Sequence, residues 1–463
     1  MRRPILSHLL VAAAALAPAA ATAATLTVDT LLDVDVLDGE CSLREAIVAA
    51  GSDSSYRDCP AGSGFDDIEF AVEGTIAIGA DLPPLAGGGI RFAGPGVDRL
   101  TIDGGGEHRL FVVDAVGPFP FAFRNLTIRG GLSPGDGGCI AFDNPPGGSS
   151  FLLFRVLLEG CRSEGEGGAV ALEGIDGGAI RESWLVDNEA ASNGGALRAY
   201  GTWSLEIRDT TISGNRAGFG GTSGSGGGLA ATFTEVGLQR VTVADNTARS
   251  NGGGLFFASN TANLSLLASS TVAGNRSGVG GSAGHLGGGI ALSAIAGLEL
   301  ANSVVAGNLQ DVSGVEDDLS SGASSSVSSS GYNWIGSNRN VTDEFPEPPV
   351  PGQPNVHGDW VGTSDEPIDP QLESLADWGG GIPTRRPAAT SPLVDLGSCT
   401  GETRDQRGYS NPATSQRIFD DETLPDALDG CDIGAVERNP LDDLPFADGF
   451  ESGDASAWSE VVP

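Results

Sequence analysis

The sequence contains no lysine, so its permanent positive charge comes from 25 arginines. These face 61 aspartates and glutamates, and the formal net charge is −36. A surface of this sign repels the phosphates of nucleic acids and the head groups of anionic lipids. We therefore exclude nucleic acid and anionic membrane surfaces as partners.

The chain also lacks a segment that would span a membrane. Its N-terminal apolar run, residues 5–17, is shorter than the ~18–20 residues of a transmembrane helix, and no later run reaches that length. Arg2 and Arg3 precede the run and an Ala-Thr-Ala sequence follows it, as in signal peptides. We predict a signal peptide over residues 1–23 and an exported chain that begins at Ala24. Loss of the two arginines changes the net charge from −36 to −38.

Six cysteines, an even number, suit a compartment in which disulfides persist. No C-x-x-C spacing occurs, which disfavours a redox or metal site, although metal binding stays the alternative. Six cysteines allow fifteen pairings. The prediction is three local disulfides, Cys41–Cys59, Cys139–Cys161 and Cys399–Cys431.

An internal repeat dominates the chain. Seven segments end on LTIRGG, VLLEGC, SWLVDN, TTISGN, VTVADN, STVAGN and SVVAGN, at positions 131, 161, 188, 215, 246, 275 and 308. Successive ends are 30, 27, 27, 31, 29 and 33 residues apart. Between them a glycine pair recurs six times, from GGCI at 137–140 to GGGI at 287–290. A period of this length indicates a solenoid.

Two apolar columns run through the repeats. One stands three residues before each end, from Ile128 to Val305, and the other stands five residues further back, from Phe123 to Leu300. Because strand side chains alternate with period two, both columns face one interior only if the chain bends between them. Each repeat is therefore one turn of a coil. We predict an all-β, right-handed parallel β-helix in which the asparagines that end five repeats bond along the coil.

Two other architectures fit less well. An antiparallel sandwich or propeller would show hairpin signals every 8–12 residues, and those do not repeat here. A helical solenoid has a similar period but conflicts with 71 glycines and the β-branched runs.

The ends of the coil differ from its repeats. Ser42 and Glu45 form a capping box that predicts a short helix, our candidate for the cap that an open coil end needs. Residues 321–358 are rich in serine and proline and predict a loop or linker. The predicted divisions of the mature chain are 24–65 (cap), 66–320 (coil), 321–358 (loop or linker), 359–437 (terminal segment) and 438–463 (tail).

Several motifs resemble those of exported bacterial proteins. Residues 41–47 read CSLREAI, as in CSLREA-domain proteins, and the glycine-pair repeats resemble polymorphic outer-membrane proteins and other pectin-lyase-like β-helices. The terminal segment is similar to the choice-of-anchor Q domain at DPQL (369–372), SPLVD (391–395), DQRG (405–408) and DIGAVE (432–437). The tail, with FADGFESGD at 446–454 and Trp458, resembles one seen on exported proteobacterial proteins.

The resemblance implies a fold and a location rather than an activity, because the family as a whole has no assigned one. The location is extracellular or the outer surface of a Gram-negative bacterium. A non-catalytic β-helix that presents ladders of side chains for adhesion or glycan binding, without a cofactor, is the function we favour. The alternative is a polysaccharide lyase or glycoside hydrolase, for which the resemblance to lyases implies carboxylates that hold Ca²⁺ beside an arginine or lysine base.

Candidate site residues lie in the expected corner between the two apolar columns. Glu182, Asp209 and Arg240 occupy this corner on successive turns ~4.8 Å apart, with Asp187 and Asp245 nearby. In the enzymatic interpretation the four carboxylates hold Ca²⁺ and Arg240 is the base. A solvated ladder of opposite charges, common on repeat proteins, is the interpretation we favour.

Overall fold

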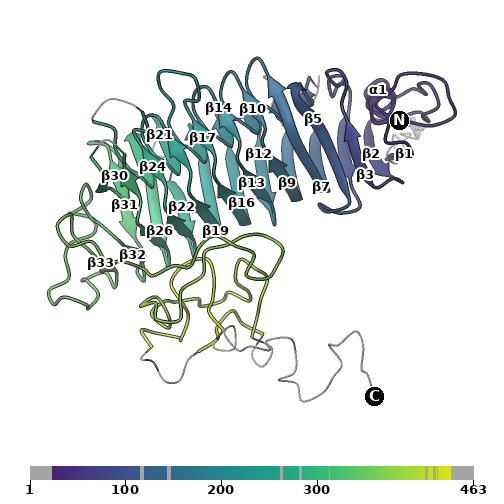
Figure 1. Ribbon diagram of the computed structural model, residues 1–463. Coiled ribbons are helices and arrows are strands. Elements are labelled where there is room, and N and C mark those ends of the chain that lie inside the picture. Colours follow the sequence, from purple (N-terminus) through teal and green to yellow (C-terminus); the bar gives the residue numbers. More distant parts are fainter. Residues whose placement is uncertain are drawn as a thin grey trace, which may run out of the picture.

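The computed structural model describes residues 23–114, 119–142, 148–260, 264–280, 284–311, 313–411, 415–420, 424 and 426–439. They form a parallel β-helix of about nine turns, which confirms the predicted fold class (Figure 1). Residues 1–22 of the predicted signal peptide and residues 440–463 of the predicted tail lie outside the described residues. No helix in the described part of the chain is long and apolar enough to cross a membrane.

One wall of the coil is a sheet of eight parallel strands, one from each of eight turns. Its members are β6 (Phe111–Val113), β8 (Ile140–Phe142), β11 (Val170–Glu173), β15 (Leu197–Tyr200), β18 (Leu229–Thr232), β21 (Leu255–Ser259), β25 (Ile290–Ala294) and β30 (Leu319–Ser321). The remaining strands form a second, larger sheet that wraps around the rest of the coil.

The second sheet contains a long strand in each turn, bent in the middle or split in two. The unsplit members are β7 (Pro120–Ser133), β9 (Ser150–Glu159), β16 (Ser204–Ser213) and β19 (Glu235–Ala244). The split ones are β12 (Gly177–Arg181) with β13 (Trp184–Val186), β22 (Leu264–Ala268) with β23 (Thr271–Ala273), β26 (Gly297–Ala301) with β27 (Val304–Ala306), and β31 (Ser326–Ser329) with β32 (Trp334–Ile335). Short strands close each turn: β10 (Arg162–Ser163), β14 (Glu189–Ala190), β17 (Arg216–Ala217), β20 (Thr247–Ala248), β24 (Arg276–Ser277) and β28 (Leu309–Gln310).

The bend lies where the two apolar columns require it. The residue two positions after the column that runs from Phe123 to Leu300 has a left-handed backbone in all seven repeats, with φ between 45° and 55°. This bend in the strand directs the side chains of both columns into the interior of the coil, and all fourteen are fully buried. The bent corner consists of Asn125, Arg155, Glu182, Asp209, Arg240, Ser269 and Asn302.

The asparagines at the next corner form a continuous ladder. Asn188, Asn215, Asn246 and Asn275 each donate a side-chain N–H to the side-chain oxygen of the next asparagine at 2.9 Å. The last one, Asn308, donates to Asp318 at 2.8 Å instead. All five asparagines are fully buried, so the ladder is an interior element, as predicted.

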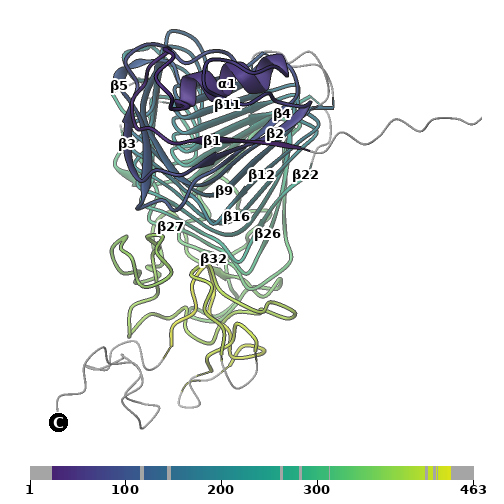
Figure 2. The same ribbon diagram turned by 90° about the vertical axis from the view of Figure 1, so that its right-hand side faces the viewer.

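The N-terminal end is capped by α1 (Leu43–Ser52), which lies across the end of the coil in Figure 2. Its capping box is present: Ser42 accepts the Glu45 backbone N–H, and the Glu45 carboxylate accepts that of Ser42. Leu43, Ala46 and Ile47 bury its apolar face.

The coil is longer than predicted at its N-terminal end. β1 (Ala24–Val28) precedes the cap helix and pairs in parallel with β2 (Phe65–Phe70), so the predicted cap region contributes a strand to the coil. The irregular turns that follow contain β3 (Gly74–Ala77), β4 (Gly89–Ala93) and β5 (Leu100–His108).

Part of the predicted loop or linker, residues 321–358, also belongs to the coil, so that assignment was wrong for β31 and β32, whereas its proline-rich part, residues 345–354, contains no strand. β31 pairs in parallel with β26, and β32 pairs with β33 (Trp360–Val361). Strand pairing uses the backbone, so β31 forms with only one apolar side chain, Val327, facing the interior. β29 (Val315–Glu316) pairs antiparallel with β28.

The structure joins Cys41 to Cys59, Cys139 to Cys161, and Cys399 to Cys431 in disulfides. The first lies at the cap, the second between neighbouring turns, and the third inside the terminal segment. Disulfides of this number fit an extracellular protein.

Candidate functional site

The terminal segment, residues 359–437, packs against the side of the coil beneath β16 and β19 (Figure 1). The side-chain amide of Gln406 donates to the Thr210 carbonyl at 3.0 Å and to the Thr211 hydroxyl at 2.8 Å, and its oxygen accepts from Thr242 at 2.6 Å. Further along, the Ala435 backbone N–H donates to the Thr271 hydroxyl at 3.1 Å. A threonine column on three successive turns therefore holds the segment.

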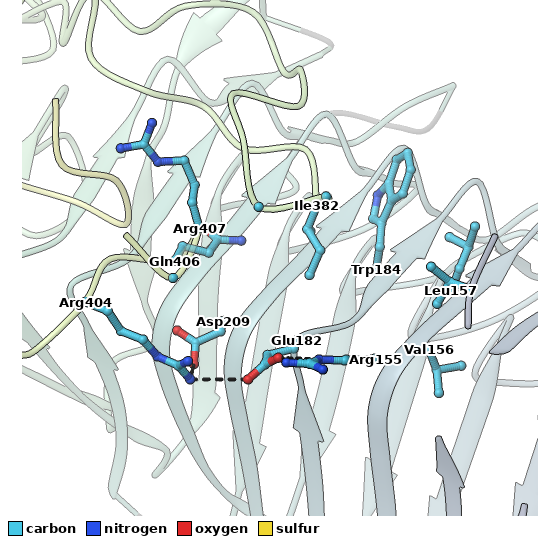
Figure 3. A pocket seen from close by; sticks show the side chains of 14 residues that line it. Arg155, Val156, Leu157, Glu182, Trp184, Asp209, Ile382, Arg404, Gln406 and Arg407 are labelled. Carbon is cyan, nitrogen blue, oxygen red and sulfur yellow. Dashed lines mark hydrogen bonds and ion pairs between the residues drawn. The ribbon is translucent and has the colours of Figure 1, made fainter. Parts of the chain in front are cut away.

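Next to this contact, the bent corner forms a row of alternating charges. The Arg155 Nε lies 2.7 Å from a Glu182 oxygen, and Arg240 holds Asp209 through two N–H groups at 2.6 and 3.1 Å. Arg404 of the terminal segment lies between the two acids, 3.3 Å from Glu182 and 3.1 Å from Asp209 (Figure 3). Each carboxylate therefore contacts two arginines.

Behind this row lies a buried cluster of charges within the terminal segment. Arg417 is fully buried and bonds Glu402 at 2.9 Å and Glu437 at 3.2 Å. Burial and the nearby Asp432 carboxyl raise the pKa of Glu437 well above its ordinary value, although Arg417 acts in the opposite direction. Burial also raises the pKa of Asp432 to about 7. Glu402 behaves differently: burial would raise its pKa, but Arg417, with smaller contributions from Ser269 and Arg240, outweighs burial and lowers it.

These pKa shifts predict that the terminal segment is most stable near about pH 4, close to the unfolded pKa values of the carboxyl groups. A carboxyl with a raised folded pKa stabilises the fold below its unfolded pKa, and this contribution is lost as the pH rises through about 7 for Asp432. Glu402, with a lowered pKa, contributes above its unfolded value and loses this as the pH falls. Thermal unfolding from pH 2 to 8 should show the maximum, and Asp432→Asn should flatten the decline at higher pH. Asp98→Asn, at an exposed position of the coil, is the control, and an unchanged decline in Asp432→Asn would contradict the assignment.

A cleft of about 550 Å³ opens where the terminal segment meets the coil. We call it the junction cleft; its lining is Val97, Arg155, Val156, Leu157, Glu182, Trp184, Asp209, Gly380, Gly381, Ile382, Arg404, Gln406, Arg407 and Gly408. The half-buried Trp184 is held in place because its indole N–H donates to Ser213 at 2.9 Å. In Figure 3 Trp184 stands between Ile382 and Leu157, and the charged row lies below them in the view.

The predicted site residues are partly brought together. Glu182 and Asp209 share the junction cleft, and Arg240 supports Asp209 from the next turn, with 10% of its side chain exposed. Asp187 and Asp245 lie at the following corner, where Arg385 contacts Asp245 at 2.7 Å.

The sequence interpretation missed Arg155 and Arg404 as members of the site. Arg155 was visible in the corner column, one turn before Glu182. Arg404 follows the repeats by about 100 residues, and only its place beside the DQRG motif at 405–408 marked it. Asp405 and Arg407 of this motif form a local salt bridge, at 2.8 Å and almost fully buried.

The donor set of the corner does not fit Ca²⁺. This ion takes six to eight oxygen ligands, whereas Glu182 and Asp209 face three guanidinium groups within 2.6–3.3 Å. The positive charges of these arginines would repel a Ca²⁺ ion placed at the same carboxylates. Asp395, Asp420 and Asp426 form another acidic cluster, separate from the junction cleft.

No protein-family model matches the sequence, and no curated protein is similar to it. Among solved structures, the crystal structure of pectate lyase Pel9A matches with a TM-score of 0.36 and 12% identity. The match covers 81% of this chain and 88% of that chain. So distant a likeness assigns no residue of the junction cleft a role.

Proposed function

We propose that this protein is an exported β-helix that binds a saccharide in the junction cleft without cleaving it. The observation that supports this proposal is the junction cleft, whose lining combines a fixed Trp184 ring with ion-paired arginines. Its volume lies within the range of small-molecule sites, which combine apolar surface with a few polar groups. An indole face packs against the C–H face of a sugar ring. The N–H groups of Arg155 and Arg404, with side chains 59% and 42% exposed, suit sugar hydroxyls.

Export and the outer surface of a Gram-negative bacterium form part of the same proposal. The signal-peptide pattern, the disulfides and the resemblance to CSLREA and choice-of-anchor Q proteins support this location. Two of the resembling motifs have a structural use: CSLREA forms the capping box, and DQRG contributes Gln406 to the contact with the coil.

The enzymatic alternative has a weaker basis. Glu182 and Asp209 do meet in an open junction cleft, as a lyase site would require. However, Arg240 is mostly buried and holds Asp209 with two N–H groups, so its proton is committed to an ion pair. A guanidinium is also a very weak base unless its surroundings lower its pKa, and a neighbouring carboxylate does the reverse.

The test is a glycan array probed with the mature protein, followed by titration calorimetry with the strongest ligand. Trp184→Ala is expected to weaken binding by at least about tenfold, which corresponds to about 1.4 kcal/mol. Trp203→Ala is the matched control, because Trp203 is 82% exposed. It precedes Asp209 by six residues of extended chain, which span roughly 20 Å.

Equal binding by the Trp184→Ala and unsubstituted proteins, or no retained saccharide, would refute the proposal. The enzymatic alternative is tested beside it by incubating acidic polysaccharides with protein and Ca²⁺. Unsaturated products that disappear in Glu182→Gln/Asp209→Asn would establish a lyase instead.

A further inference from the structure

Asp66 of β2 occupies a place in the coil interior that is otherwise apolar. In the strand register it pairs with Ile90, which pairs with Phe121, and Phe121 in turn pairs with Phe151. Asp66 and these three residues are buried, with at most 3% exposed. One Asp66 oxygen accepts the Ser63 backbone N–H at 2.7 Å, whereas Oδ2 has no hydrogen-bond partner among the described residues.

The surroundings of Asp66 disfavour its negative charge. Burial raises its pKa, and the neighbouring acids Asp53 and Asp67 act in the same direction. Space beside it is also closed: a Cβ on Gly62 would lie 2.6 Å from Oδ2 and 2.9 Å from the Ala50 Cα. A carboxylate in such a place is stable only if a cation reaches it.

The group opposite Asp66 is the backbone nitrogen of Ala24. The two residues are register partners in the β1–β2 pair, and the Ala24 N–H interacts with the Asp66 carboxyl. Ala24 is also the residue that follows the predicted cleavage site. In the precursor its nitrogen is a neutral amide, whereas in the mature chain it is an α-ammonium.

We propose that removal of the leader creates an ion pair between the α-ammonium of the half-buried Ala24 and the buried carboxylate of Asp66. A signal peptidase would hydrolyse the Ala23–Ala24 bond with one water, leaving a carboxylate on Ala23 and an amine that takes a proton on Ala24. The new positive charge lies beside β2 and next to the loop that follows α1. Its ion pair with Asp66 therefore joins β1 to β2 in the first turn of the coil. The cap therefore reaches full stability only after export, and this inference is independent of the proposed saccharide site.

The absence of lysine makes the test direct, since the α-amine is the only primary amine of the mature chain. The full mature protein, with its N-terminus verified by mass spectrometry, is treated with an amine-reactive reagent at a series of pH values. The reaction rate reports the fraction of unprotonated amine. An ordinary α-amine has a pKa near ~8, and pairing should raise it by about one unit or more, so that about tenfold less amine reacts at pH 7.

Asp66→Asn should return the amine to its ordinary titration, and Asp67→Asn is the matched control because Asp67 faces Arg91 instead. Nα-acetylation of the unsubstituted protein should lower its thermal midpoint below about pH 8. This difference should vanish as the pH rises through the raised pKa of the amine. An ordinary amine pKa in the unsubstituted protein, or an exported chain that starts elsewhere than Ala24, refutes the proposal. The acetylation comparison needs no variant, so it remains decisive if Asp66→Asn fails to fold.

Discussion

Asn246→Ala is expected to lower the free energy of unfolding of the coil by about 3–5 kcal/mol, the loss estimated for two or three buried polar groups left without partners. The Asn246 side-chain oxygen accepts two N–H groups of Asn215, from its backbone at 3.0 Å and its side chain at 2.9 Å. Its own amide donates to the Ile212 carbonyl and to the Asn275 side chain, both at 2.9 Å. Alanine removes these bonds in a place that water does not reach.

Urea unfolding of the mature protein followed by circular dichroism measures this loss. Glu235→Ala, at an exposed position of the same turn, is the control and should change the free energy by less than about 0.5 kcal/mol. Equal effects of the two substitutions would mean that the asparagine ladder adds little to stability. Since each turn contacts only its neighbours, a break in the ladder should also reduce the cooperativity of unfolding.

The repeat predicted the coil because strand pairing brings equivalent residues together. Phe123, Leu153 and Ile180 pair in register, and so do Ile128, Leu158 and Leu185, as their positions in the repeat required. The corner followed from the odd spacing of the two columns. The bend was predicted because a straight strand would expose one of them, whereas its left-handed backbone became visible only in the structure.

Other features had no periodic signal. Ser326–Ser329 forms a strand through its backbone, and composition alone indicated a loop there. β1 precedes the cap in sequence but completes the first turn of the coil, because a parallel strand pair can enclose a long connection.

The candidate site was predictable only on its coil side. Glu182, Asp209 and Arg240 follow from the repeat, but their closest terminal-segment partner does not. Arg404 is 222 residues from Glu182 and 195 from Asp209, and the terminal segment has no repeat to set its position. The sequence therefore showed the charges of the corner without showing that an arginine from elsewhere pairs with them.

That contact depends on the buried charge cluster of the terminal segment, so Arg417→Met is expected to detach the segment from the coil. Arg417 is fully buried, and methionine would leave Glu402 and Glu437 without its charge. Its guanidinium also donates to the Gly434 carbonyl at 2.6 Å. Removing one partner of a buried ion pair costs about 3–5 kcal/mol, more than an irregular segment of this size can readily lose.

Limited proteolysis followed by mass spectrometry measures the detachment, with cleavage expected within residues 359–437 while the coil stays intact. Arg57→Met is the matched control, because the Arg57–Asp35 pair at 2.8 Å is exposed on both sides and should contribute little to stability. Adding Glu437→Gln to Arg417→Met replaces one of the buried carboxyl groups that lose their partner, so the double variant should resist protease better than Arg417→Met alone. If Arg417→Met resists protease as well as Arg57→Met does, the cluster does not hold the segment. If the segment is released, Arg404 and Ile382 leave the junction cleft with it, and saccharide binding should be lost in the same variant.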